Sequence, residues 1–361
     1  MRLPRLAPAV VVSLMLTSCS IGSPTAPVAP VAAPASGSAT PAAPTGTRHT
    51  AGAQRTAPPA SAHPVAGAPL PSPAALVPFG QPASAGQGAW HPAGRPIGGV
   101  PAVYETTLVP PGGTQPAGIA WMNTHLLSAR LYSGSLSTPG GGPYRYTAPV
   151  ALAQARTLVA AFNGGFQMNT ARGGYYAERR MIYPLRAGAA SLVIYADGTV
   201  DIGAWGRDVR MTPQVVSVRQ NLKPLVAGGR PTRLAATRHW LQEWGDTCSA
   251  TSCGHGLPGV EHQWRTGLGI TADGALVYVY GPALDPLQLA QLLVRAGVVR
   301  GMEFDINPYW PFFVTYDPPA GASAAPSDGS KLLSSTVQGP STVFEASWDR
   351  DFITMSARPA R

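Results

Sequence analysis

The chain of 361 residues has few charged side chains: Asp, Glu, Lys and Arg make up 12% of it. Lysine is almost missing, since Lys223 and Lys331 are the only two. The net charge of +9 is therefore carried by arginines, which are dispersed and form no basic helix or basic-aromatic platform. We expect no nucleic-acid partner, because such proteins concentrate basic residues on one face or element. An anionic wall polymer fits a chain of this charge.

Long apolar segments are also missing. A transmembrane helix takes about 20 consecutive apolar residues, and no segment of the sequence provides them. The N-terminus has Arg2 and Arg5, followed by a mostly apolar stretch over residues 6–16. A short positive region before a brief apolar region is typical of a secretory signal peptide. We predict a signal peptide over residues 1–18 and export of the chain.

Cysteine occurs only three times. Cys19 follows Leu16-Thr17-Ser18, and an apolar residue, two small residues and a cysteine are typical of a bacterial lipoprotein signal. We predict lipidation at Cys19, which would hold the protein on the cell membrane, facing the wall or periplasm. Stable anchoring of this kind takes more than one acyl chain. The alternative is an ordinary secretory signal in which the cysteine is incidental.

The two other cysteines, Cys248 and Cys253, lie close together in the segment DTCSATSCGHG. Outside the cytoplasm such a pair is expected to form a disulfide. A zinc site that adds His255 and His262 is the alternative, although this spacing matches no common zinc pattern. We predict the disulfide, and no metal ligands.

Large apolar residues are scarce in residues 19–96, which consist mainly of Ala, Pro, Ser, Gly and Thr. Such a composition cannot bury enough surface to offset the entropy lost on ordering. We predict a disordered tether over residues 19–96. Residues 97–361 are long enough for one sizeable core and are predicted to form a single folded domain.

Two β-hairpins are marked by Asp-Gly pairs between runs of β-branched residues. They are expected around Asp197-Gly198, within residues 191–205, and around Asp273-Gly274, within residues 268–281. Glycine accepts the positive φ that a tight hairpin turn requires. The domain is therefore predicted to consist mainly of short strands.

One helix is expected from Asp285 to about Ala296. Asp285 can cap the first turn, Pro286 suits the first helical position, and Gly297 suits the left-handed position after the end. A strand is expected to follow at about residues 300–306. Together these elements predict an α+β fold: a strand-rich domain of hairpins and mixed sheet, with a few packed helices.

Four segments, in this order, resemble the phosphodiester glycosidase family. They are Phe162-Asn163-Gly164-Gly165-Phe166, residues 219–229, the strand that starts at Arg265-Thr266, and the helix followed by the strand that reaches Asp305. The resemblance covers roughly residues 100–355. It implies hydrolysis at the anomeric carbon of a sugar-1-phosphodiester, which releases a free sugar and a phosphomonoester.

The sequence departs from the family after Asp305. The family's glycine run is replaced by Ile306-Asn307-Pro308-Tyr309-Trp310, and Glu303 stands where the family usually has Asn. The segment that would line the bottom of the expected site therefore differs from that of the family. This difference affects which substrate the site would accept and, to a lesser degree, whether it is active.

The resemblance assigns catalytic roles to Asp305, Glu303 and Arg265. A guanidinium gives bidentate hydrogen bonds to phosphate, so we expect Arg265 to hold the departing phosphate. A carboxylate can activate water or stabilise an oxocarbenium-like centre, and Asp305 is our first candidate. Glu303 shares a strand face with Asp305. The two carboxylates could divide acid and base roles, or hold a divalent cation with Asn307.

Further residues of the four segments are expected to bind substrate: Asn163, Gly164, Gly165, Arg219, Asn221, Thr266 and Asn307. Glycines allow a close approach of backbone to ligand. The aromatic residues Tyr309, Trp310, Phe312 and Phe313 could form a stacking wall for sugar rings, or pack in the core. We expect no resident cofactor.

Two functions of different classes follow. The first is an exported lipoprotein hydrolase that cleaves the glycosidic bond of sugar-1-phosphodiesters in envelope glycans or glycolipids. The alternative is a non-catalytic glycan-binding module of the cell envelope on the same fold. A structural wall protein is a third hypothesis, which predicts that Asp305 and Arg265 lie far apart.

Overall fold

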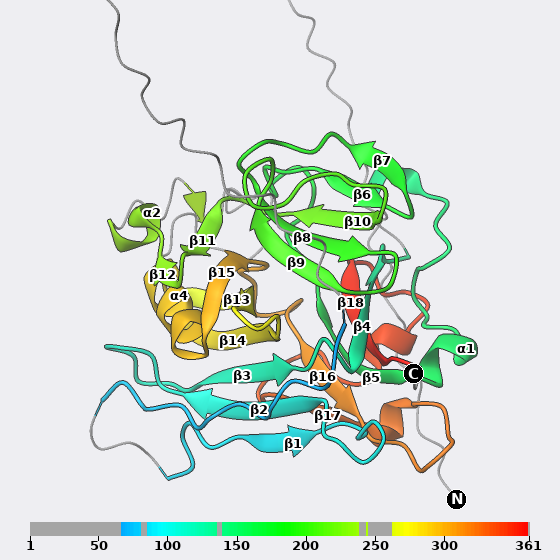
Figure 1. The fold of residues 1–361 in the computed structure, drawn as a ribbon, viewed down its shortest axis with the longest axis horizontal. Helices are drawn as coiled ribbons and strands as arrows, with labels where there is room; N and C mark the ends of the chain where they lie inside the picture. The colour runs from blue at the N-terminus through cyan, green and yellow to red at the C-terminus, as the bar shows by residue number, and fades with distance from the viewer. Residues whose placement is uncertain (1–65, 81–84, 136–138, 238–242, 245–261, 360–361) are drawn as a thin grey trace, which may run out of the picture. The chain divides into compact units, whose positions relative to one another are not determined.

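The computed structural model describes residues 66–80, 85–135, 139–237, 243–244 and 262–359 (Figure 1). In these ranges the strands form three sheets, and every pairing between neighbouring strands is antiparallel. The predicted tether up to residue 65, Cys19, and the Cys248–Cys253 pair lie outside the described residues.

The largest sheet has eight strands. In spatial order they are β1 (His91–Ala93), β2 (Val103–Leu108), β3 (Ala117–Met122), β14 (Leu276–Leu284), β13 (Gln263–Thr271), β15 (Val298–Glu303), β11 (Pro224–Ala227) and β12 (Arg230–Pro231).

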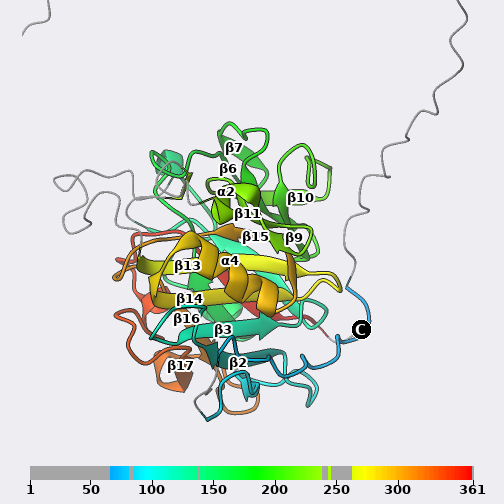
Figure 2. The ribbon, with the colours of Figure 1, turned by 90° about the vertical axis from the view of Figure 1, so that its left-hand side faces the viewer.

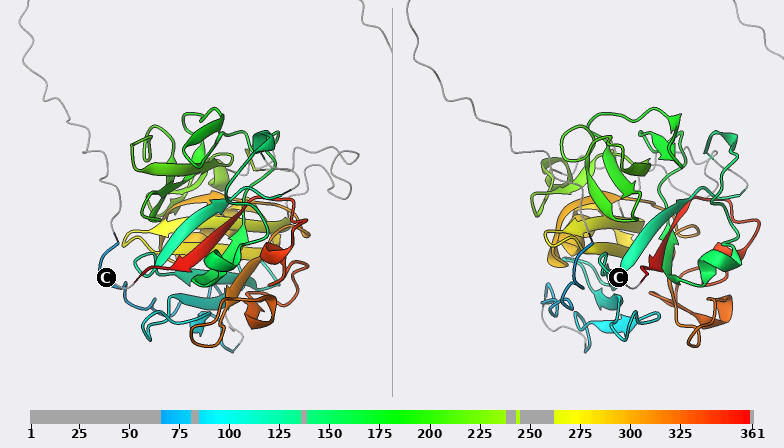
Figure 3. Two further views of the ribbon diagram at one scale, coloured as in Figure 1. Left: turned by 90° about the vertical axis from the view of Figure 1, so that its right-hand side faces the viewer. Right: turned by 45° about the vertical axis from the view of Figure 1, so that its right-hand side comes forward.

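Two smaller sheets have five strands each. One runs β7 (Arg180–Tyr183), β6 (Tyr175–Ala177), β10 (Val215–Gln220), β8 (Ala190–Tyr195) and β9 (Val200–Ala204). The other runs β17 (Gly329–Lys331), β16 (Phe313–Tyr316), β5 (Leu158–Asn163), β18 (Phe352–Ala357) and β4 (Leu127–Tyr132). Figure 3 shows β18 lying between β5 and β4, near the end of the chain.

Helices are few and short among the described residues. They are α1 (Leu152–Ala155), α2 (Arg233–Ala236) and α4 (Pro286–Arg295), with 3-10 turns η1 (Pro139–Gly141), η2 (Pro326–Asp328) and η3 (Thr342–Phe344). The structure is therefore mostly β, with a small helical part. The expected α+β class overstated the helices, while the strand-rich character is confirmed. The expected mixed sheet was wrong, since the paired strands of the described residues are all antiparallel.

The predicted helix is α4. Asp285 caps it by accepting a hydrogen bond from the backbone N–H of Gln288, and the Gln288 side chain returns a bond to the Asp285 N–H. Gly297 follows with φ of 87°. The buried face of α4 packs on the eight-stranded sheet, against β13, β14 and β15 (Figure 2). Helix and caps are confirmed.

Both predicted hairpins are present. β8 and β9 pair around Asp197-Gly198, and β13 and β14 pair around Asp273-Gly274. Gly198 and Gly274 have φ of 78° and 92°, the left-handed values that these turns require. The largest apolar cluster takes side chains from all three sheets, including Phe162, Leu192 and Leu268. The sheets therefore share one core.

The folded part begins before residue 97, so the predicted boundary of the tether was wrong. β1 pairs with β2, and Leu70, Leu76 and Trp90 pack against the core beside α4. The Trp90 indole N–H also donates to the carbonyl of Ala74 at 2.9 Å. A few large apolar residues in a Pro-rich segment are enough to bind it to a preformed sheet. In the described part of the chain, no helix is long and apolar enough to span a bilayer.

Candidate active site

The Asn-Gly-Gly segment is a buried turn at the end of β5. The Asn163 side chain accepts a hydrogen bond from the Tyr278 hydroxyl at 2.6 Å and donates to Thr266 Oγ1 at 3.2 Å. A side chain at Gly164 would lie 2.2 Å from Oδ2 of Asp351, and one at Gly165 would lie 2.8 Å from Oδ1 of Asn221. Glycine is therefore required at both positions, because Asp351 and Asn221 leave no room for a Cβ atom.

Arg219 is held at the end of β10 by a carboxylate that sequence reasoning missed. Its Nε lies 2.7 Å from Oδ2 of Asp351, and Nη2 lies 3.3 Å from Oδ1. Its Nη1 donates to the carbonyl of Gln220 at 2.8 Å, and Nη2 also donates to the carbonyl of Phe166. Only 1% of the Arg219 side chain is exposed. The guanidinium is therefore fixed in place.

Arg265 does not reach the same place as Arg219. Its Nη1 lies 2.6 Å from Oε1 of Glu303 and donates to the carbonyl of Trp244 at 2.9 Å, while Nε donates to the carbonyl of Leu284 at 2.7 Å. Both charged side chains are buried. Strand alternation explains the outcome, because Arg265 and Thr266 point to opposite faces of β13. Arg265 pairs with Glu303, and not with Asp305.

Asp305 follows β15 and is tied to the Arg265-Thr266 strand through Thr266. Its N–H donates to Thr266 Oγ1 at 2.9 Å, and its Oδ1 accepts from the N–H of Ile306 at 2.9 Å. Oδ2 lies 3.5 Å from Nη2 of Arg350. The same Nη2 donates to the carbonyl of Gly165 at 2.8 Å. Arg350, which sequence reasoning also missed, therefore joins Asp305 to the Asn-Gly-Gly turn.

Burial changes the acidity of both predicted carboxylates. It raises the pKa of Asp305 to about 6, although the Arg350 guanidinium opposes the shift. It raises the pKa of Glu303 to about 7, with Arg265 opposing. A buried carboxyl group prefers its neutral form unless a cation compensates. The pKa of Asp305 is therefore raised toward neutral pH, where a general base is most effective.

A cavity of 270 Å³ opens beside these groups. Arg219, Arg350 and Asp351 form its charged wall. The remaining lining consists of Pro139, Phe166, Gln167, Met168, Asn169 and Tyr183. Asp305 is not part of the lining; it stands behind Arg350, with 9% of its side chain exposed. The cavity thus presents two guanidinium groups. Arg219 is paired with Asp351, and Arg350 lies 3.5 Å from Asp305 and donates to the carbonyl of Gly165 at 2.8 Å.

The other predicted residues divide into two groups. Asn221 belongs to the site frame: its Oδ1 accepts from the Phe166 N–H at 3.0 Å, and its Nδ2 donates to the carbonyl of Glu303 at 2.9 Å. Asn307 instead stabilises its own turn by accepting from the Tyr309 N–H at 2.7 Å. The predicted residues Asn163, Arg219, Asn221, Thr266 and Asp305 are thus linked in one network, which Arg350 and Asp351 complete.

Only some of the four aromatic residues that were expected to stack on sugar rings are accessible to a ligand. Phe312 and Phe313 are buried in the core, so they cannot contact a sugar. Tyr309 is 46% exposed. Trp310 lies against the Arg350 guanidinium, 5.6 Å from ring centroid to Cζ. Within the described residues, no group of three or more His, Cys, Asp or Glu side chains could hold a metal ion.

The chain matches no family model and no curated protein. Among solved structures it is similar to the catalytic domain of zebrafish N-acetylglucosamine-1-phosphodiester alpha-N-acetylglucosaminidase, auto-inhibited by its pro-peptide. That alignment has 17% identity and a TM-score of 0.43, and covers 74% of this chain and 87% of the zebrafish domain. It is also similar to a hypothetical protein from Synechocystis, with 11% identity, a TM-score of 0.35, and coverage of 74% and 64%.

Proposed function

We propose that this chain is an exported hydrolase that cleaves the glycosidic bond of sugar-1-phosphodiesters in envelope glycans or glycolipids. In this proposal it is retained on the cell membrane through lipidated Cys19. The observation that carries the proposal is the contact between Asp305 and Arg350, 3.5 Å apart, in which Arg350 lines a cavity and Asp305 lies behind it. A phosphodiester needs a cation beside its phosphate and a carboxylate near its anomeric carbon.

Arg350, and not Arg265, is the phosphate ligand in this proposal. Charge-assisted hydrogen bonds between guanidinium and carboxylate are typically about 2.7–2.9 Å long. Arg219 and Asp351 meet this value at 2.7 Å, whereas Arg350 and Asp305 do not. In this proposal Arg350 exchanges its 2.8 Å hydrogen bond to the carbonyl of Gly165 and its 3.5 Å contact with Asp305 for a phosphate oxygen, and this movement opens the carboxylate of Asp305 to the cavity.

Asp305 then acts on the water. Its carboxylate takes a proton as the water oxygen bonds to the anomeric carbon, and the bond from that carbon to the phosphate oxygen breaks. The phosphomonoester leaves with the bonding electrons, and Arg350 neutralises its charge. Because the phosphate is already a good leaving group, no strong general acid is required. Glu303 lies outside this sequence of steps, since it is neutralised by Arg265.

The experiment is turnover of soluble sugar-1-phosphodiesters by the purified full-length protein, measured as released reducing sugar. Asp305→Asn removes the base and keeps the shape, so turnover should fall about 10²–10⁴-fold while the melting temperature is retained. Glu345→Gln, at an exposed carboxylate, is the matched control and should keep full activity. Full activity in Asp305→Asn would show the proposal to be wrong.

The second candidate is a glycan-binding module without catalysis. It is favoured by Arg219 and Arg265, each of which is held by a carboxylate and by backbone carbonyls of the protein itself. It predicts that the protein binds sugar-1-phosphodiesters without releasing reducing sugar. It also predicts that Asp305→Asn leaves their affinity nearly unchanged, since Asp305 stands behind the cavity wall.

A further inference from the structure

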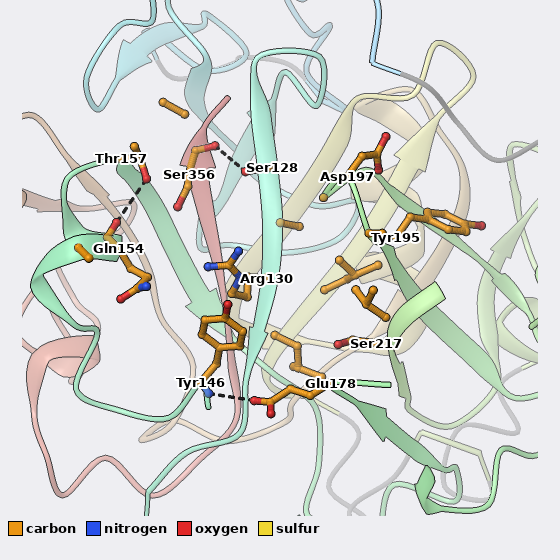
Figure 4. Close-up of a pocket in the computed structure, with 18 residues that line it drawn as sticks. Ser128, Arg130, Tyr146, Gln154, Thr157, Glu178, Tyr195, Asp197, Ser217 and Ser356 are labelled. Atoms are coloured by element: carbon orange, nitrogen blue, oxygen red, sulfur yellow. Dashed lines mark hydrogen bonds between the residues drawn. The ribbon is translucent and has the colours of Figure 1, made fainter. Parts of the chain in front are cut away.

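A second pocket, of 310 Å³, lies at the outer edge of β4 (Figure 4). It shares no lining residue with the cavity beside Arg350. One side is formed by Arg130 of β4, Ser356 of β18, and Tyr146 from the segment that follows β4. The other side is formed by the β8–β9 turn and by Ser217 of β10. Figure 4 shows these two groups on either side of the strand.

On the outer edge of β4, only a very short stretch of backbone is left without a partner among the described residues. The Ala129 N–H donates outward to the carbonyl of Gly198 at 2.8 Å, and the Ser133 N–H donates to the carbonyl of Tyr146 at 3.0 Å. Alternate residues of an edge strand point their backbone groups outward, so Leu131 lies between these two closed positions. In the described part of the chain, no strand pairs with Leu131 on this side. A strand of about five residues would not fit, so the occupant must be compact.

Ser217 of β10 belongs to the lining of the pocket, and the residue is 7% exposed. Figure 4 shows its side chain across β4 from Tyr146 and Ser356. A serine hydroxyl both donates and accepts hydrogen bonds. Ser217 therefore adds a polar group of either kind to this side of the pocket.

The charged groups that line the pocket favour an uncharged polar ligand over an anionic one. Arg130 lies over the Tyr146 ring, with Cζ 4.2 Å from the centroid. Glu178 accepts from the backbone N–H groups of Arg145 and Tyr146 at 3.0 Å and 2.9 Å. Asp197 also lines the pocket. Two carboxylates against one guanidinium disfavour a phosphate or carboxylate ligand, because like charges repel.

We propose that this pocket binds a neutral sugar residue of a glycan chain. A sugar presents several hydroxyl groups, each of which both donates and accepts hydrogen bonds. The pocket offers donors at Arg130 and the Leu131 N–H, acceptors at Glu178 and Asp197, and a hydroxyl at Ser217. Its volume lies at the lower end of the range for small-molecule sites, about 300–1,000 Å³.

The pocket and the Arg350 cavity lie along the same two strands. On β10, Ser217 is at the pocket and Arg219 is at the cavity. On the last strand, Ser356 is at the pocket and Asp351, directly before β18, is at the cavity. At about 3.3 Å per residue, the sites are roughly 16 Å apart along β18. A polymeric glycan bound at the pocket would keep its other residues near the cavity. Only this link between the pocket and the cavity rests on the proposed hydrolysis.

The experiment measures binding of three neutral tetrasaccharides, chitotetraose, cellotetraose and maltotetraose, to the full-length protein by ligand-observed NMR and calorimetry. At least one should bind. Ser217→Ala and Arg130→Gln should each weaken that binding about 2- to 10-fold, which corresponds to one lost hydrogen bond. Thermal melts check that both variants fold, and Arg130 is an exposed side chain that tolerates replacement.

Two controls locate the binding. Ser330→Ala removes an exposed hydroxyl on β17 and should leave affinity unchanged. Asp305→Asn should also bind the tetrasaccharide normally, because the pocket is separate from the cavity. Ser217→Ala should keep full turnover of a small soluble phosphodiester, so a failure of catalysis and a failure of this pocket give different results. The proposal is overturned if none of the three sugars binds, or if both pocket variants bind like the unaltered protein.

Discussion

Arg219 and Asp351 form a two-point ion pair inside the protein, although they are 132 residues apart in the sequence. Nε lies 2.7 Å from Oδ2, Nη2 lies 3.3 Å from Oδ1, and the side chains are 1% and 5% exposed. The pair connects β10 of one five-stranded sheet to the start of β18 in the other. It also forms part of the wall of the candidate active site. The same contact therefore stabilises the fold and shapes the candidate active site.

Breaking this pair should destabilise the protein strongly. Arg219→Gln leaves the Asp351 carboxylate buried without its cation, which typically costs about 3–5 kcal/mol. Arg207→Gln is the matched control, because Arg207 pairs with Asp208 at the surface and is 65% exposed. Exposed pairs contribute about 0–1 kcal/mol. Urea denaturation of the two variants compares the costs, and equal losses would contradict the structural assignment.

The Asn-Gly-Gly turn should not tolerate a methyl group. In Gly164→Ala the new Cβ would lie 2.2 Å from Oδ2 of Asp351 and 2.8 Å from its backbone oxygen. Since that backbone cannot move far, we expect a loss of about 1–3 kcal/mol, as for an overpacked core. Gly80→Ala is the control, because no atom lies within 4 Å of its added Cβ. Thermal melts should show a lower melting temperature for Gly164→Ala alone.

The Arg265–Glu303 pair should behave as a structural unit. Arg265→Met leaves the Glu303 carboxylate buried without its cation, and Glu303→Leu removes the carboxylate that Arg265 pairs with; the loss of one partner of a buried pair typically costs about 3–5 kcal/mol. The double variant removes both charges, so its cost should be about 0.5–3 kcal/mol smaller than the sum of the two single costs. Denaturant unfolding of the four proteins gives this coupling energy. Strictly additive losses would mean that the two side chains do not stabilise each other.

Much of the fold could be predicted where the signals are local. The α4 helix carries its own cap at Asp285 and its own stop at Gly297, and the Asp-Gly turns fix two hairpins. These features involve residues within a few positions of each other, so their physics is visible in the sequence.

The site could be predicted only in part, because its partners come from distant segments. The four family-like segments identified Asn163, Arg219, Thr266 and Asp305, which do meet. Nothing around residue 350 signals that Arg350 and Asp351 would complete the site. Strand alternation could have shown that Arg265 and Thr266 face opposite sides, but not which carboxylate Arg265 would meet.

The N-terminal predictions concern residues outside the described ranges and are open to direct test. Cys19→Ala removes the acceptor for acyl chains, so the protein should move from the detergent phase to the aqueous phase when cells are extracted. Because each buried CH₂ contributes about 0.8 kcal/mol, loss of several chains should abolish retention. Cys253→Ala, which leaves the lipobox intact, is the control. Unchanged partitioning of Cys19→Ala would rule out the lipid anchor.

Three carboxyl groups, of which Glu303 and Asp305 are buried and Glu105 is half-buried, should make the protein less stable as the pH rises. Burial raises the pKa of Glu105 and Glu303 to about 7 and that of Asp305 to about 6, from 4.5 and 3.8. Between those values the folded protein holds more protons than the unfolded chain. The stability they contribute is complete below about pH 4 and is lost as the pH rises through 6–7.

Glu105 isolates this effect, because desolvation is the sole cause of its shift and its Oε1 is buried without a hydrogen-bond partner among the described residues. Glu105→Gln removes the ionisation and keeps the shape. It should raise the free energy of unfolding at pH 8 by about 1–3 kcal/mol, since one pKa unit corresponds to about 1.4 kcal/mol. At pH 4.5, where Glu105 is protonated in the folded protein, the same substitution should change stability little. Glu345→Gln, at an exposed carboxylate, should have little effect at either pH. Urea titrations at the two pH values give the comparison, and an equal effect of Glu105→Gln at both would show that folding does not raise the pKa of Glu105.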